Sequence, residues 1–170
     1  MQSNRYRSFA ALLFLIALLL APATLHSQSK PTGKDLVMGG LKCGMTKTEV
    51  LKLLKEPNRK EDSGFNVVWT YSNPSMEVTL DDRPDHSKKL PEPVVSVLTT
   101  RSSGTTVTVD GKKIKVGSKI SDVESILGKA HETDVVVFDT EYLWYNKALS
   151  VLADMNGKIY SISLWFKKAK

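Results

Sequence analysis

The stretch that decides the fold is "GMTKTEVLKLLKEPN" at residues 44–58, because a variant of it, "GSKISDVESILGKAH", recurs at residues 117–131. In the first stretch, Thr46 is followed three residues later by Glu49, which is the pattern of a capping box at a helix start. Pro57 cannot continue a helix, so it marks the end. We therefore predict that each stretch forms one short helix of roughly two to three turns, which is marginal in water unless it packs on something else.

An apolar stripe runs along each predicted helix. Val50, Leu53 and Leu54 stand at positions i, i+3 and i+4, which places them on one helix face. The second stretch repeats this stripe, but it has Lys119 where the first has Thr46. We therefore expect its N-terminal cap to come from Ser118 or Ser121.

The two stretches belong to a longer alignment with a constant offset. Adding 73 to each residue number from 44 to 81 aligns this segment with residues 117–154 without a gap. The identical pairs are Gly44 with Gly117, Val50 with Val123, Leu54 with Leu127, Phe65 with Phe138, Asn73 with Asn146, Val78 with Val151 and Asp81 with Asp154. We interpret this spacing as an internal duplication.

Segments of alternating or β-branched residues follow each predicted helix. They predict strands at 66–72, 75–81 and 93–100, and again at 138–146, 148–154 and 158–166. The third strand of each set aligns at an offset of 65, and a hairpin around Asp110-Gly111 is expected at 107–117. Asn156-Gly157 is the pattern of a two-residue hairpin turn.

Together these elements predict an α+β fold of two tandem repeats. Each repeat is expected to be a short helix, or a helix pair, packed on one face of its own antiparallel sheet. We place the first repeat at residues 28–100, a linker at 101–106 and the second repeat at 107–170.

Residues 1–27 have the plan of a secretory signal peptide. Arg5 and Arg7 precede an unbroken apolar run at residues 10–21, and small residues follow it. The run is shorter than a helix needs to cross the ~30 Å hydrocarbon core of a membrane. We therefore predict an exported chain, periplasmic or extracellular after cleavage behind Ala23 or Ser27, with no stable membrane insertion of the mature chain.

The charge pattern and the cysteine content limit the kinds of partner and of covalent link that we expect. The chain carries a formal net charge of +6, and its densest basic segment, at 110–119, alternates with apolar residues as a solvated strand does. We expect no nucleic-acid partner. Cys43 is the one cysteine, so no internal disulfide can form. It is either a reactive or intermolecularly bridged thiol or a small apolar residue at a strand end.

No catalytic motif is present in the sequence. The paired Cys-x-x-Cys, the His-Glu-x-x-His, the phosphate loop and the nucleophile elbow are all missing. We predict that the chain is not an enzyme, that it uses no cofactor and that it holds no metal. The acidic stretch "DDRPDH" at 81–86 could suit a hard cation, but a solvated loop between two strands explains it as well.

The aromatic residues are the candidate binding residues. Trp69 and Tyr71 share one face of a strand, and so do Tyr142 and Trp144 at the aligned positions. They form an interface surface if that face points away from the helices, and core if it points toward them. Trp165 differs, because alternation places it with Ser161 and Ser163 on a polar face. There it would be an exposed binding contact, or it would be exposed because the C-terminal end of the chain frays.

The motif residues resemble a known family. Gly44-Met45-Thr46 with Glu49-Val50, then Trp69-x-Tyr71, is similar to the small exported BamE (SmpA/OmlA) domains, and two units in tandem resemble the β-lactamase inhibitor protein family. The resemblance implies helices on an antiparallel sheet and binding of proteins rather than catalysis. The function predicted from the sequence is therefore a secreted or periplasmic, non-enzymatic protein-binding module with a protein partner that the sequence does not identify. The alternative is an exported domain that binds a small molecule or a divalent metal.

Overall fold

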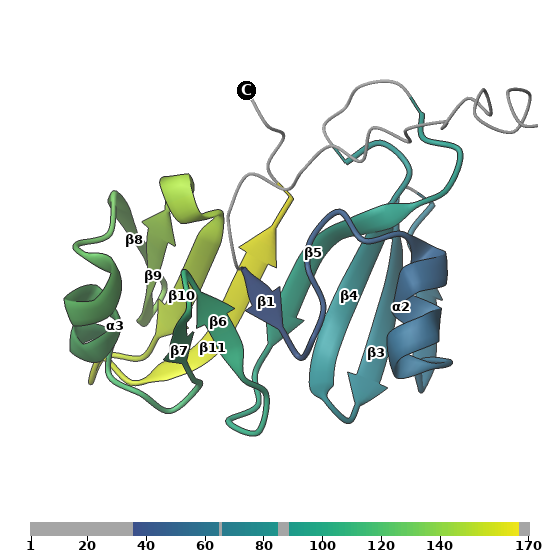
Figure 1. Ribbon diagram of the computed structural model, residues 1–170. Helices are drawn as coiled ribbons and strands as arrows, with labels where there is room; N and C mark the ends of the chain where they lie inside the picture. The colour runs from purple at the N-terminus through teal and green to yellow at the C-terminus, as the bar shows by residue number, and fades with distance from the viewer. Residues whose placement is uncertain (1–35, 65, 85–88, 167–170) are drawn as a thin grey trace, which may run out of the picture.

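The computed structural model describes residues 36–64, 66–84 and 89–166, and Figure 1 shows their arrangement. The predicted signal peptide at 1–27 lies outside these residues. The helices are α2 (Lys47–Leu54), α3 (Ile120–Leu127) and the 3-10 turn η1 (Tyr145–Lys147). The strands are β1 (Val37–Met38), β2 (Arg59–Asp62), β3 (Val67–Ser72), β4 (Ser75–Asp81), β5 (Val94–Thr100), β6 (Val107–Val109), β7 (Lys112–Ile114), β8 (Glu132–Val136), β9 (Asp139–Trp144), β10 (Leu149–Ala153) and β11 (Ile159–Trp165).

One large antiparallel sheet dominates the molecule. It has eight strands in the order β2-β3-β4-β5-β11-β10-β9-β8. Its centre is the pairing of β5 with β11, in which Leu98 lies opposite Leu164 and Thr99 opposite Ser163. We call this strand pair the central seam. A second, three-stranded sheet has the order β1-β6-β7.

The predicted fold class is therefore wrong. The described chain is mostly strand with two short α-helices, and a continuous sheet replaces two separate helix-on-sheet repeats. The physical reason lies in the last strand of each predicted repeat. Left apart, β5 and β11 would each present an open edge of unpaired backbone groups, and their pairing removes both edges.

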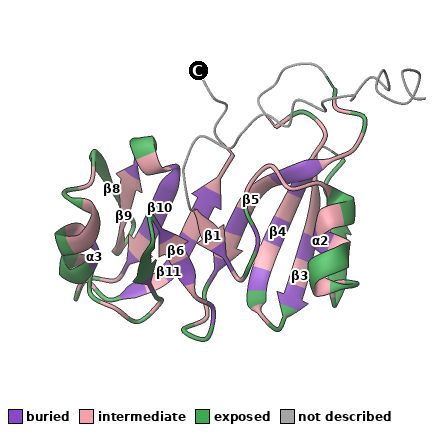
Figure 2. Ribbon diagram, viewed as in Figure 1, coloured by how far each residue is buried: buried purple, intermediate pink, exposed green. Residues whose placement is uncertain are grey.

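All the covering elements lie on one side of the large sheet. Helices α2 and α3 flank the small sheet (Figure 1). The buried residues gather on the strands (Figure 2), and those of the large sheet form one core cluster with those of the small sheet and with Val50 and Val123 of the helices. The core includes Val78, Leu98, Leu164 and Leu149 on four adjacent strands, all of them inaccessible to solvent. None of the described elements packs on the opposite side, which we call the open face.

The 73-residue offset recurs in the elements. Helix α3 begins and ends 73 residues after α2, and β4 and β10 each carry an irregularity, between Thr79 and Leu80 and between Leu152 and Ala153. The predicted offset of 65 between the last strands of the two repeats is wrong, however. Thr79 pairs with Val97 and Leu152 with Ser161, so β5 and β11 correspond at an offset of 64 rather than 65.

The two helices start differently. The predicted capping box of α2 is confirmed, because the Glu49 amide donates to Thr46 Oγ1 at 3.2 Å and the Thr46 amide donates to Glu49 Oε2 at 2.8 Å. The predicted cap of α3 from Ser118 or Ser121 is wrong. Its N-cap residue is Lys119, whose side chain has no acceptor, and only the reverse bond from the Lys119 amide to Asp122 Oδ2 is present, at 3.3 Å.

The predicted apolar stripe of α2 is partly wrong. Val50 is buried and Leu54 packs against the core, but Leu53 is 56% exposed. Leu51 takes its place against the core. The helix is therefore turned so that positions i, i+1 and i+4 from Val50 face the sheet.

The segment between β4 and β5 supports α2. The Thr48 amide and hydroxyl both donate to Glu92 Oε1, at 2.7 and 2.6 Å. A carboxylate at a helix N-terminus satisfies free amide groups and interacts favourably with the helix dipole. The β4–β5 connection therefore has a structural role through Glu92.

Candidate functional site

Three of the aromatic residues singled out from the sequence lie in the core. Trp69, Tyr71 and Trp144 are each at most 3% exposed and face the covering layer. Tyr142 is partly buried and stacks on Trp144, with 6.4 Å between ring centroids and 26° between ring planes. The face that these four residues share thus points toward the helices.

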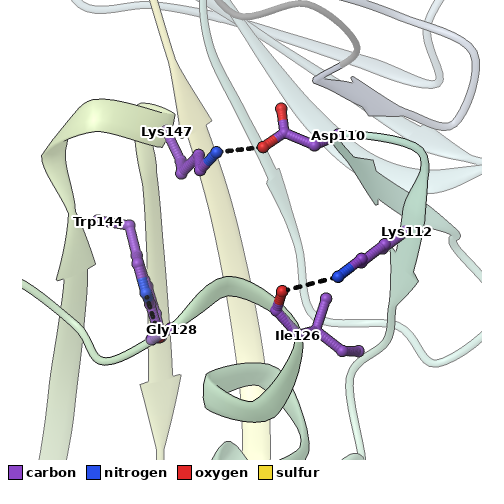
Figure 3. Close-up of polar contacts among 6 residues, drawn as sticks. All are labelled: Asp110, Lys112, Ile126, Gly128, Trp144 and Lys147. Carbon is purple, nitrogen blue, oxygen red and sulfur yellow. Dashed lines mark hydrogen bonds and ion pairs between the residues drawn. The ribbon is translucent and has the colours of Figure 1, made fainter.

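Two of these side chains bind the helix ends. The Tyr71 hydroxyl donates to the carbonyl oxygen of Lys55 at 3.2 Å, and Trp144 Nε1 donates to the carbonyl oxygen of Gly128 at 3.0 Å (Figure 3). Lys55 and Gly128 are the C-cap residues of α2 and α3. The aromatic residues therefore fix each helix to its sheet through an otherwise unsatisfied carbonyl group.

The hairpin of β6 and β7 makes polar contacts with the second half of the chain, at α3 and at η1. Lys112 Nζ donates to the carbonyl oxygen of Ile126 at 3.1 Å, and Lys147 pairs with Asp110 (Figure 3). Two charged residues of the densest basic segment, Asp110 and Lys112, thus make intramolecular contacts.

Trp165 lies on the open face, partly buried, opposite Val97 across the central seam. The two serines placed with it by alternation differ. Ser161 is buried, whereas Ser163 is partly exposed and shares a 2.9 Å hydrogen bond with Thr99. Trp165 therefore belongs to the middle of the large sheet and not to a frayed end.

A continuous row of paired residues crosses the open face. Its central members are small and polar, so this side of the sheet is polar near the seam and charged toward both edges. From β2 to β8 the row consists of Arg59, Thr70, Glu77, Thr99, Ser163, Ser150, Leu143 and Glu132.

The most exposed apolar group in the described chain was missed by the sequence reasoning. It consists of the last two residues of β8 and the two-residue turn to β9, Val135-Val136-Val137-Phe138, which we call the apolar tip. Val135, Val137 and Phe138 are 73%, 81% and 74% exposed, and Val136 is 46% exposed. Four adjacent apolar residues next to Asp134 were the available signal, since exposed apolar runs mark interaction sites or errors of design.

Val137 also has an unfavourable backbone conformation. Its φ is +61°, in the left-handed region that a β-branched residue rarely adopts. The residue at the aligned position in the β2–β3 turn is Gly64, with a φ of +80°. That turn is polar, because the Gly64 amide donates to Asp62 Oδ1 at 2.7 Å and Ser63 Oγ to Asn66 Oδ1 at 2.7 Å. The apolar tip therefore combines exposed apolar side chains with backbone strain, whereas the aligned turn exposes polar residues and has glycine at the position of positive φ.

A shallow pocket of about 400 Å³ lies at the start of β11. Arg101 and Lys158 contribute positive charge to its lining, and Tyr160 contributes a hydroxyl. That hydroxyl donates to Asp139 Oδ2 at 2.9 Å. Burial first, and then the hydrogen bond to Asp139 and its negative charge, raise the pKa of Tyr160.

Cys43 is partly buried against the core. Burial raises the pKa of its thiol from 9.0 to about 12, and a hydrogen bond with the backbone of Leu98 offsets only part of that effect. A thiol in this state is a poor nucleophile at neutral pH. The structure thus favours the apolar, structural role for Cys43.

The acidic stretch at 81–86 is only partly described. Asp81 Oδ1 accepts from the Arg83 amide at 2.7 Å, and Asp82 pairs with Lys89 at 3.0 Å. Asp85 and His86 lie outside the described residues. Within those residues, no group of three or more His, Cys, Asp or Glu side chains is placed to hold a metal ion.

The described part of the chain contains no helix long and apolar enough to cross a membrane. No protein-family model and no curated protein matches the sequence. Among solved structures, a DUF4309 family protein (YjgB) from Bacillus subtilis subsp. subtilis str. 168 is 14% identical with a TM-score of 0.46, over 72% of this chain and 78% of that one. An extracellular protein containing a SCP domain, from Bacillus anthracis str. Ames, is 12% identical with a TM-score of 0.46, over 72% of this chain. The chain spans 43% of the length of that second protein.

Proposed function

We propose that this protein is an exported, non-enzymatic module that binds another protein and that the apolar tip is its main contact surface. The observation that carries the proposal is the exposure of four adjacent apolar side chains at the end of β8 and in the turn after it, where Val137 has a strained backbone. The aligned β2–β3 turn closes its hairpin with polar residues and a glycine instead. Local departures of this kind from favourable sequence choices concentrate at functional sites.

Three further features support this proposal. The N-terminal sequence has the plan of a signal peptide, which supports export. The resemblance to the BamE and inhibitor-protein families implies protein binding. The two aromatic pairs face the covering layer, with three of the four residues buried and Tyr142 partly buried, so the tip is the larger apolar surface available to a partner. Trp165 on the open face remains a second proposed contact.

A capture experiment with matched variants tests the proposal. The mature chain, residues 28–170, is immobilised and exposed to a periplasmic or culture-supernatant fraction of the source organism. The tip variant carries Val135→Ser, Val137→Gly and Phe138→Ser. Met155→Ser is the control, because Met155 is an 80% exposed apolar residue in another loop.

The parent chain and Met155→Ser should retain the same protein, and titration of that purified protein should show at least tenfold weaker binding to the tip variant. Equal binding to the tip variant would remove the tip from the proposal, and the same titration with Trp165→Ala then tests the open face. Capture of no protein by the parent chain would overturn protein binding altogether.

The pocket at the start of β11 favours a second candidate function, the binding of a small anion. Arg101 and Lys158 outnumber Asp154, the one carboxylate in its lining, and a site of this size accommodates a small molecule. Thermal melts against a panel of small carboxylates and phosphates test this candidate. A melting temperature that rises for the parent chain but not for Arg101→Gln would support it, and a melting temperature unchanged by every compound would end it.

A further inference from the structure

The two outer strands of the large sheet differ in how well they are protected. Among the described residues, strand β8 pairs only with β9, and strand β2 pairs only with β3. All five residues of β8 and all four of β2 are exposed. An edge strand presents unpaired backbone amide and carbonyl groups to solvent, and these groups can pair with another chain.

Strand β2 carries charges of both signs that neutralise one another. Arg59 pairs with Glu61 at 2.7 Å, and Lys60 pairs with Glu56 at 2.6 Å. Lys60 also lies over the ring of Trp69, 5.4 Å from its centroid. Mixed charges and lysines are common means of protecting an edge strand.

Asp134 of strand β8 has no such compensating charge among the described residues. Asp134 lies directly opposite Glu141 of β9, and like charges in that position destabilise a strand pair. The contacts of the described residues provide no ion pair for Asp134 or Glu141. Asp139 adds a third carboxylate beside the apolar tip. The β8 edge is therefore acidic along its strand and apolar at its tip.

We propose, resting on the proposed function, that the partner supplies an extended segment of alternating basic and apolar residues that adds to β8 as a ninth strand. Backbone hydrogen bonds to the free edge provide affinity, as in other strand-addition complexes. Basic side chains of the segment lie beside Asp134 and Glu141, and an apolar side chain packs on the tip. Binding thus removes the like-charge repulsion and covers the exposed valines together.

Charge selects this occupant over others. A second copy of the chain that paired through its own β8 would bring a second Asp134 close to the same carboxylates, which is unfavourable. The carboxylates also oppose binding to an anionic membrane surface. A basic extended segment is the occupant that satisfies both the acidic strand and the apolar tip.

Synthetic peptides test the mode of binding without knowledge of the partner. The probe is a seven-residue peptide of alternating Lys and Val with blocked ends. One control peptide has Glu in place of Lys, and a second has Pro at its central Val, which removes a backbone donor and disfavours a ladder. Binding to the mature chain is measured by fluorescence anisotropy at low and high salt, and the exchange of backbone amides by NMR.

The Lys–Val peptide should slow the exchange of the β8 amides that are not bonded to β9, and its affinity should fall as salt rises. Asp134→Lys should weaken binding at least tenfold. The matched control is Glu61→Lys, at the position 73 residues earlier on β2, which should leave binding unchanged. The Glu–Val and Pro-containing peptides should bind at least tenfold more weakly than the probe.

Several outcomes would overturn strand addition. They are protection that maps to β2, equal binding of the Glu–Val peptide, or no effect of Asp134→Lys. Protection of β8 that appears without peptide and rises with protein concentration would identify a second copy as the occupant instead. If capture of a protein depends on the tip but β8 gains no protection, protein binding stands and strand addition falls. Capture of no protein at all counts against the proposed function itself.

Discussion

Tyr71 and Trp144 make the same structural contact with different chemical groups. Each donates a hydrogen bond from a buried aromatic side chain to the carbonyl oxygen of a helix C-cap residue, Lys55 in one case and Gly128 in the other. The donor is a phenol in the first half of the chain and an indole in the second. The geometry of the helix end, and not the identity of the aromatic residue, is what the two halves share.

The Tyr71 bond can be removed with little change of shape. Tyr71→Phe should lower the free energy of unfolding by about 1 kcal/mol, because the Lys55 carbonyl loses its donor while the ring stays packed. Urea denaturation followed by tryptophan fluorescence measures the change. Tyr142→Phe is the control and should change the free energy of unfolding by less than about half that amount, because the Tyr142 hydroxyl makes no hydrogen bond to the described part of the chain. Equal losses for the two variants would show that the Lys55 contact does not contribute.

The C-cap positions predict a stabilising substitution. Lys55 has a φ of 63° and a ψ of −155°, a backbone region that is essentially restricted to glycine. Gly128 occupies the same place after α3, with a φ of 83° and a ψ of 175°. Lys55→Gly should therefore raise the free energy of unfolding by about 1 kcal/mol, since release of strain exceeds the entropy cost of glycine.

Two matched variants check the Lys55 prediction. Gly128→Lys should destabilise the protein, and Lys52→Gly, inside α2, should cost about 1 kcal/mol because glycine disfavours a helix interior. Chemical denaturation measures all three variants. A Lys55→Gly protein that is less stable than the parent would contradict the assignment of strain to this residue.

The start of α3 lacks a side-chain acceptor, so it can be improved. Lys119→Thr should raise the free energy of unfolding by about 1 kcal/mol, because threonine at this N-cap can accept from the Asp122 amide as Thr46 accepts from Glu49. Thr46→Ala should lower the free energy of unfolding by a similar amount. Thermal unfolding of both variants, with the parent alongside, measures the effect. No gain from Lys119→Thr would mean that Asp122 alone already satisfies this helix end.

Two groups predict a loss of stability at alkaline pH. Burial raises the pKa of Cys43 from 9.0 to about 12, and burial together with the charge of Glu56 raises the pKa of Tyr71 from 10.0 to about 12. The unfolded chain therefore loses these protons at lower pH than the folded chain does. The free energy of unfolding should be insensitive to these groups below pH 9 and should fall as pH rises from 9 toward 12.

Urea denaturation at a series of pH values from 7 to 11 tests this dependence. Cys43→Ala should remove the part of the decline that begins near pH 9, and Tyr71→Phe the part that begins near pH 10. The Cys43 thiol should also react slowly with a disulfide reagent in the native protein and quickly in urea. Fast native reaction would contradict the burial of the thiol.

The sequence predicted the strands with clear alternation. Met76, Val78 and Leu80 alternate with polar residues along β4, and all three are buried as this pattern requires. Strands β2 and β8 were not predicted. β2 reads Arg-Lys-Glu-Asp and buries no side chain, so it carries no periodic signal.

Turn chemistry was a less reliable guide. Asn156-Gly157 predicted a two-residue hairpin, which is wrong, because the last strand pair is Ala153 with Ile159. The five residues between them are organised by Asp154, whose Oδ1 accepts from the amides of Asn156 and Lys158, both at 2.9 Å. A side chain that satisfies its own loop can override the preference of a dipeptide.

The pairing of β5 with β11 at the central seam could not be predicted from the sequence of either strand alone. A half-polar strand is compatible with an edge or with the middle of a sheet, and Ser163 and Thr99 show nothing in sequence that marks them as partners. The candidate site had the same limitation. Trp69 shares a strand face with Tyr71, and Trp144 shares one with Tyr142. The alternation that shows this does not reveal whether either face is covered.

The position of β11 has a consequence for the order in which the protein can be completed. β11 is the last strand along the described chain, yet it lies in the middle of the large sheet, between β5 and β10. When the chain is synthesised or exported N-terminus first, β5 and β10 each keep one edge of unpaired backbone groups until residues 159–165 are available to pair with both. Deletion of these residues would therefore divide the sheet at its centre, and folding cannot finish strand by strand during synthesis or export.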